Sequence, residues 1–188
     1  MRKFFIAASL GAAAAAVAAE PATFNIDPGH TVVTFEALHM NTSTQRGRIQ
    51  AKEGSVVIDR AAKTGKADIT LDLTTLSAAS SSLEGSLKGE RLFNVAQSPT
   101  ARFVGDTFTF DGDKLASVSG TLTILGKSQP TTLRATRFNC YENAQLKREV
   151  CGGDFTGTVQ RSQFGLGFLP NVTPDAVPLL IQVEAIRQ

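Results

Sequence analysis

Apolar and polar residues alternate with a period of two along much of the chain after residue 22. Between Ala67 and Leu73 every second residue is apolar, and Asp, Thr and Asp lie between them. Residues 121–124 repeat the pattern, and residues 179–185 follow it around Gln182 and Glu184. Successive side chains of a strand point to opposite faces, so each segment has one apolar and one polar face. The pattern therefore predicts antiparallel sheets that are covered on one side only.

Nine segments have this strand character, and turn signals such as Asp27-Pro28-Gly29 and Asp111-Gly112-Asp113 separate most of them. We expect strands at 22–27, 31–39, 46–59, 66–74, 101–110, 115–125, 131–139, 154–162 and 177–186. This many strands in one small domain must either stack as a sandwich or close into a barrel around a shared interior.

Residues 77–95 lack the alternation. Ser80 to Ser82 could cap a helix that places Leu83 and Leu87 on one side, while two glycines weaken it. We therefore expect one short helix or an irregular lid around 80–94 in an otherwise all-β domain.

The first 19 residues resemble a secretory signal peptide. Arg2 and Lys3 precede an apolar run that ends in small residues at Ala18 and Ala19. Cleavage there would leave a single domain at 20–188, and no later stretch approaches the roughly 20 apolar residues that a membrane span needs. We therefore expect an exported protein without a membrane span.

The charge of the domain is balanced. The chain has 19 basic and 17 acidic residues, and removal of Arg2 and Lys3 would leave 17 of each. A neutral chain without a basic stripe argues against nucleic acid as a partner.

Cys140 and Cys151 are the only cysteines. In an exported chain, two cysteines 11 positions apart favour a disulfide that closes a hairpin, because a reactive thiol pair is more often spaced C-x-x-C.

Motifs for catalysis or metal binding are absent from the sequence. There is no G-x-S-x-G motif, and His30 and His39 do not form a metal-ligand cluster with each other or with cysteines. We expect no catalytic residues, no metal and no cofactor.

Two polar residues interrupt the apolar faces. His39 is in phase with Val33 and Phe35, and Arg161 is in phase with Phe155 and Val159. A polar group on an inward face needs a partner. Each could bind a ligand headgroup, or it could lie at a strand end where solvent or backbone carbonyls satisfy it.

The order of several motifs resembles the YceI-like family of exported lipid-binding proteins over nearly the whole domain. The matching segments are Phe24 to His30, Val33 to His39, Gly47, Gly54, Ile58-Asp59, Leu87 to Asn94, Pro99 to Phe103, Gly120 to Ile124 with Gly126 and Pro130, Arg161 to Gly165 and Val177 to Glu184.

The resemblance implies a lipocalin-like antiparallel barrel of about eight strands that holds a long isoprenoid or another amphiphilic lipid. It also implies a periplasmic location, no catalysis and a possible homodimer. Family members usually have His and Asp where this chain has Ser86 and Arg91, so we expect the entrance to differ.

We expect His39 and Arg161 at the mouth of such a barrel. The expected wall consists of Val33, Phe35, Leu71, Leu87, Leu122, Ile124, Phe164 and Ile181. One alternative is a β-sandwich interaction module with a filled core. Another is a hydrolase built on a serine and His39, although the only nearby acid, Glu36, would point to the opposite face.

Overall fold

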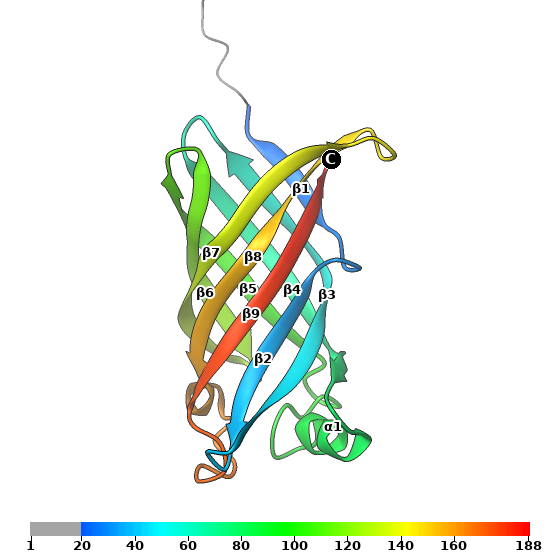
Figure 1. Ribbon diagram of the computed structural model, residues 1–188, viewed down its shortest axis with the longest axis vertical. Coiled ribbons are helices and arrows are strands. Elements are labelled where there is room, and N and C mark those ends of the chain that lie inside the picture. Colours follow the sequence, from blue (N-terminus) through cyan, green and yellow to red (C-terminus); the bar gives the residue numbers. More distant parts are fainter. Residues whose placement is uncertain (1–19) are drawn as a thin grey trace, which may run out of the picture.

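The computed structural model describes residues 20–188, so the signal segment expected at 1–19 lies outside the described residues. Strands dominate this part of the chain (Figure 1). They are β1 (Ala22–Ile26), β2 (Val32–His39), β3 (Ser43–Asp59), β4 (Thr64–Ser77), β5 (Thr100–Asp111), β6 (Lys114–Ile124), β7 (Lys127–Asn143), β8 (Arg148–Gln160) and β9 (Ala176–Arg187). The helix α1 spans Ser81–Lys88, and a 3-10 helix, η1, spans Arg161–Phe164.

The strands close into one antiparallel barrel. The order β3-β2-β9-β8-β7-β6-β5-β4 returns to β3 through the β3–β4 pairing. The short β1 also lies between β3 and β9, at the opposite end from β2, so nine strands occupy eight positions around the barrel. This closure confirms the barrel and excludes the sandwich alternative.

An exposed turn separates β1 from β2. The Asp27 side chain accepts a hydrogen bond from the Gly29 backbone N–H (2.9 Å) and contacts His30 Nδ1 (2.8 Å). The hydrogen bond to His30 lowers the pKa of Asp27, and the same contact raises the pKa of His30. The pair supports the break in the strand and lies on the outer surface, so it does not belong to the barrel interior.

The alternation observed in the sequence corresponds to the two faces of the wall. In β9, Val177, Leu179 and Ile181 are buried while Pro178 and Leu180 are exposed. The expected strands are all present, but β7 and β8 extend beyond their expected ends toward the hairpin that joins them. At its other end β8 stops at Gln160, because the chain turns into η1, so the strand expected through residue 162 is shorter.

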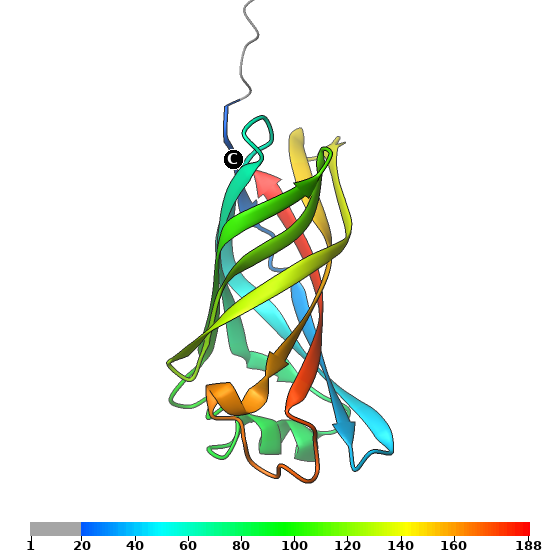
Figure 2. The same cartoon turned by 90° about the vertical axis from the view of Figure 1, so that its left-hand side faces the viewer.

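The helix α1 confirms the short helix that was expected around residues 80–94. Ser80 is its N-cap, and its Oγ accepts a hydrogen bond from the Leu83 N–H (3.3 Å). The helix and the segment after it lie across one end of the barrel, beside the 165–175 loop (Figure 2).

Cys140 and Cys151 form the expected disulfide, with an S–S distance of 2.10 Å. They lie directly opposite one another in the β7–β8 ladder, near the hairpin at the end of the barrel away from α1. Arg60 contacts both sulfur atoms and donates to Glu149 Oε1 at 2.7 Å. The bond therefore ties two strands that are already paired.

We expect reduction of this disulfide to destabilise the barrel without unfolding it. The bridge closes a short loop, for which the loop-entropy model gives roughly 3 kcal/mol at most, and the β7–β8 ladder remains when it is broken. Urea unfolding with and without reductant measures the loss. The double variant Cys140→Ser/Cys151→Ser serves as control, since reductant should leave its stability unchanged. Complete unfolding on reduction would contradict this prediction.

Candidate binding cavity

The barrel encloses a cavity of about 870 Å³. This volume lies within the usual range for ligand sites in proteins. Its wall is almost entirely apolar and draws residues from every strand, from α1 and from the 165–175 loop. The interior of this barrel is therefore hollow, and not filled by its own side chains.

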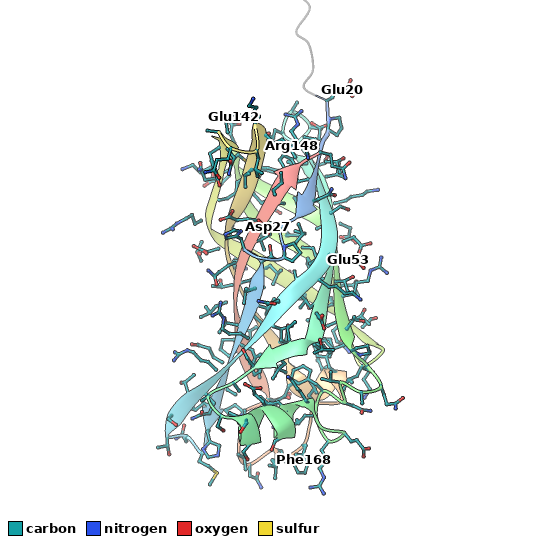
Figure 3. The ribbon with its side chains drawn as sticks, turned by 90° about the vertical axis from the view of Figure 1, so that its right-hand side faces the viewer. Glu20, Asp27, Glu53, Glu142, Arg148 and Phe168 are labelled. Carbon is teal, nitrogen blue, oxygen red and sulfur yellow. A yellow bond between two sulfur atoms is a disulfide. The ribbon has the colours of Figure 1, made fainter. Side chains whose placement is uncertain are left out.

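One end of the barrel is blocked by side chains. Phe24 is completely buried and packs with Ile58, Cys151 and Ala185 in an apolar cluster near β1. Phe168 lies at the opposite end, far from Glu142 and Arg148 (Figure 3). The cavity therefore has one apolar base and one rim, formed by the β2–β3 hairpin, α1 with the segment after it, and the 165–175 loop.

Small inward side chains explain why space remains. Ala67, Ala101 and Ala185 are buried wall residues that contribute little volume. Glycine also makes room in the wall, since the Phe35 ring lies over Gly47 on the adjacent strand β3, where a Cβ atom would come within 2.1 Å of the ring.

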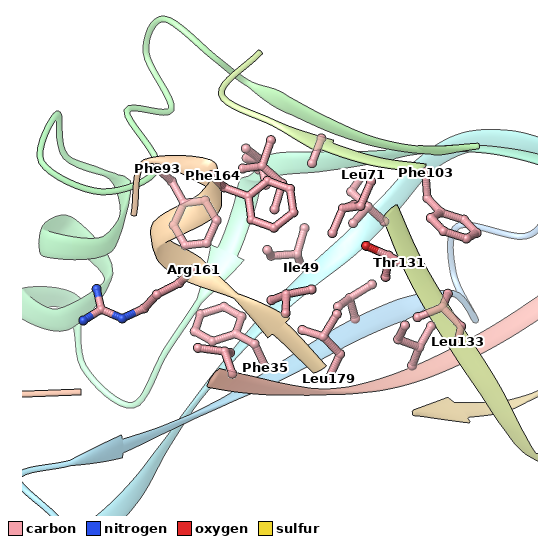
Figure 4. A pocket seen from close by; sticks show the side chains of 18 of the residues that line it. Phe35, Ile49, Leu71, Phe93, Phe103, Thr131, Leu133, Arg161, Phe164 and Leu179 are labelled. Carbon is pink, nitrogen blue, oxygen red and sulfur yellow. The ribbon is translucent and has the colours of Figure 1, made fainter. Parts of the chain in front are cut away.

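Aromatic rings narrow the cavity near the rim. The Phe35 and Phe93 rings are 6.0 Å apart between centroids, in a tilted arrangement. Phe164 in η1 is almost completely buried beside them (Figure 4). Thr131, from β7, brings a hydroxyl into the wall farther inside, and its Oγ1 lies 3.4 Å from the Gln129 carbonyl.

All ten residues that we expected at the site line this cavity. They are Val33, Phe35, His39, Leu71, Leu87, Leu122, Ile124, Arg161, Phe164 and Ile181. The inward phase inferred for His39 is therefore correct, although its ring is exposed because β2 ends at the rim. That these residues contact a ligand stays a prediction.

Arg161 has a different role from the one that we favoured. It is only 9% exposed, and its guanidinium points away from the apolar wall (Figure 4). All five of its N–H groups are used by backbone carbonyls. Nε donates to Pro174, Nη1 to Leu166 and Phe168, and Nη2 to Leu169 and Thr173. No N–H remains for a headgroup, so backbone carbonyls satisfy this arginine.

These bonds organise the loop that borders the rim. A guanidinium has five donors in a fixed plane, which suits several carbonyls that converge from one loop. Ser162 adds a second link, since its N–H and hydroxyl both donate to the Asp175 carboxylate at 2.7 Å. The hydrogen bonds from Ser162, together with the nearby Arg161 charge, lower the pKa of Asp175.

Apart from Ser86 and Arg91, which the family resemblance had linked to the entrance, the sequence did not reveal the other polar residues of the rim. Gln45, Arg46, Glu90 and Arg91 join His39 there. Arg91 lies over the Phe168 ring, 5.2 Å from its centroid. Arg46 donates from Nε to Glu36 Oε1 at 2.8 Å. Contacts between separate loops create this ring of polar groups, and no spacing along the chain signals it.

Among residues 20–188, one group of side chains has the proximity that a metal site requires. It consists of Cys140, Glu149 and Cys151. Both sulfur atoms are joined in the disulfide, so neither is a thiolate ligand. The group does not fit a resident metal in this oxidised form.

None of the helices in the described part of the chain has the length and apolar character that a membrane crossing requires.

Fold and cavity together define a barrel that is built around an apolar interior site, and comparison with known proteins gives its family. The model of the YceI-like domain matches residues 24–185, and the chain belongs to this family. A UPF0312 protein of Pseudomonas putida is 31% identical, with 100% of this chain and 99% of the relative covered. A UPF0312 protein of Pseudomonas aeruginosa is 26% identical over the whole of both chains.

Solved structures share the fold at low sequence identity. BcnA of Burkholderia cenocepacia aligns with a TM-score of 0.67 and 21% identity, over 85% of this chain and 99% of BcnA. A polyisoprenoid binding domain from Saccharophagus degradans, implicated in plant cell wall breakdown, aligns with a TM-score of 0.60 and 15% identity. This alignment covers 90% of this chain and 100% of that domain.

We expect Arg161→Met to loosen the 165–175 loop. The substitution leaves five carbonyls without their donor, and hydrogen bonds to a charged group contribute roughly 1.5–3 kcal/mol each without being additive. Urea unfolding measures the stability, and amide hydrogen exchange measures the opening of the loop. Arg137→Met is the matched control, because Arg137 is exposed and its nearest carboxylate oxygen, on Asp154, is 3.9 Å away. Equal exchange in the loop of both variants would contradict the role assigned to Arg161.

Proposed function

We propose that this protein binds a long-chain isoprenoid or similar amphiphilic lipid inside the barrel, for storage, transport or protection and without chemical conversion. The observation that carries the proposal is the hollow apolar interior, whose charged side chains are gathered at one end. Such a site suits a molecule with an apolar tail and a polar head. An isoprenoid quinone, a prenyl phosphate and a fatty amide all meet this description.

The hydrophobic effect provides the driving force. An apolar tail that enters the cavity leaves water, at roughly 25 cal/mol for each Å² of apolar surface buried. It also fills space whose wall otherwise lacks contact partners. The relation to the polyisoprenoid binding domain of Saccharophagus degradans supports an isoprenoid tail.

The polar groups of the cavity support binding over catalysis. Thr31 exchanges two hydrogen bonds with the Glu184 backbone, and Arg161 has no free donor. The hydrolase alternative needs an acid that orients His39, but the Glu36 carboxylate binds Arg46. His39 and the rim residues around it are then available to contact a headgroup, which we expect to remain near solvent.

We place this binding function in the periplasm. The disulfide supports an oxidising compartment, and the leader-like composition of residues 1–19 supports export. The homodimer implied by the family resemblance stays a prediction, which light scattering of the purified protein would test.

Organic extraction of the purified protein tests the proposed ligand. We expect mass spectrometry of the extract to show a long-chain amphiphile in stoichiometric amount, after expression in a bacterial periplasm and purification without detergent. Protein that has been unfolded and washed in urea before extraction is the control for lipid carried on the surface. A native protein whose extract contains no lipid above this control would contradict the proposal.

The variant Leu122→Trp tests the location of the ligand. Leu122 points into the cavity and is paired with Phe103 on the neighbouring strand β5. The larger Trp side chain should therefore occupy ligand space and lower the lipid content of the folded protein. Thr121→Trp is the matched control, because the neighbouring side chain points outward and is exposed. In a filled core the same change to Leu122 would instead overpack, at roughly 1–3 kcal/mol of stability. Unchanged lipid content in both folded variants would place the ligand elsewhere.

A further inference from the structure

Three exposed apolar side chains lie together at the rim of the cavity. Met40 is at the tip of the β2–β3 hairpin and is 59% exposed. Phe168 and Leu169, in the 165–175 loop, are 38% and 49% exposed. We call these three residues the rim patch. Isolated exposed apolar residues are common, but a group that borders the opening of a cavity indicates a contact surface.

The backbone of the rim patch adds an independent observation. Met40 has φ 50° and Leu169 has φ 54°, in the left-handed region that disfavours large side chains. The other large apolar residue with positive φ among the described residues, Leu125, packs its side chain against the core. Packing explains Leu125, whereas the side chains of Met40 and Leu169 remain exposed.

The rim patch is also held in place. The Met40 N–H donates to the Val172 carbonyl at 2.8 Å and joins the hairpin tip to the loop. Arg161 binds the carbonyls of Phe168 and Leu169, so the backbone under two members of the patch is anchored to η1. Phe168, Leu169 and Val172 line the cavity as well. The apolar side chains of this loop therefore belong both to the cavity wall and to the outer surface.

We propose that the rim patch docks on the surface of a lipid bilayer, so that a ligand passes between membrane and cavity without crossing water. This rests on the proposed lipid-binding function. If the rim patch touches the hydrocarbon of the membrane, a lipid tail can pass from the membrane into the cavity and contact only apolar groups on the way.

The surroundings of the patch suit the interface between hydrocarbon and headgroups. Arg91 packs over the Phe168 ring, an arrangement in which the ring can enter the membrane while the guanidinium meets phosphate groups. Arg46 and His39 border the same rim, together with Glu90. Basic side chains around an apolar centre are typical of surface binding, which adds apolar burial to electrostatic contacts with headgroups.

Flotation with phosphatidylethanolamine–phosphatidylglycerol vesicles tests the proposal. We expect the wild-type protein to float with the vesicles, and we expect Met40→Asn/Leu169→Asn to reduce its partitioning roughly tenfold. Asparagine tolerates the left-handed region, so this variant should fold at least as well as the wild type. Leu146→Asn is the matched control, because Leu146 is 48% exposed at the opposite end of the barrel, and it should float like the wild type.

Ligand measurements separate this proposal from the proposed function. With lipid supplied in detergent, the single variant Met40→Asn should reach the same final occupancy as the wild type, because Met40 is not among the residues that line the cavity. With lipid supplied in vesicles, this variant should load several-fold more slowly. Failure of the wild type to float would overturn the membrane contact, and so would equal flotation of Met40→Asn/Leu169→Asn and Leu146→Asn. Either result would point to a protein partner for the rim patch. A normal flotation result without any bound lipid would instead contradict only the lipid-binding function.

Discussion

Closure of the sheet by the pairing of β9 with β2 and β1, from opposite ends of the chain, is the constraint on which the rest of this structure depends. It gives every strand two neighbours, with β1 and β2 sharing one position, and it turns every second side chain toward a common interior. Those side chains must be apolar, because no water-exposed face remains to them. Alanines at several of these positions leave the interior hollow. Stability and the capacity to bind thus come from the same alternating positions.

A hollow interior carries an energetic cost that a bound molecule can offset. Wall atoms that face empty space lose the dispersion contacts that a packed core provides. A ligand that binds the folded state alone restores those contacts and shifts the folding equilibrium toward it. The disulfide and the apolar cluster around Phe24 stabilise the end of the barrel opposite the rim.

The rim depends on a single buried side chain more than on regular structure. The 165–175 segment has no strand or helix to satisfy its carbonyls, and Arg161 binds five of them. Desolvation of the guanidinium is compensated because each of its donors finds an acceptor. The loop can therefore present Phe168 and Leu169 to the outside and still form part of the cavity wall.

The local pattern of this sequence determined much of the fold. Alternation located all nine strands, the Ser80 cap located the helix, and the inward phase placed the seven expected residues that lie in strands on the cavity wall. These features depend on neighbours in the chain, where the direction of a side chain follows from its position in the strand. The cysteine spacing likewise indicated the hairpin disulfide.

Tertiary structure decided what periodicity cannot express. The same alternation fits an open sandwich and a closed barrel, and the pairing of the last strand, β9, with β2 and β1 distinguishes them. Arg161 was in phase with an inward face, but β8 ends one residue earlier and the arginine turns toward the carbonyls of a loop. The rim joins Met40 to Val172 across 132 residues of chain. Such contacts are absent from any sequence window, because they form only when distant strands bring their loops to the same end of the barrel.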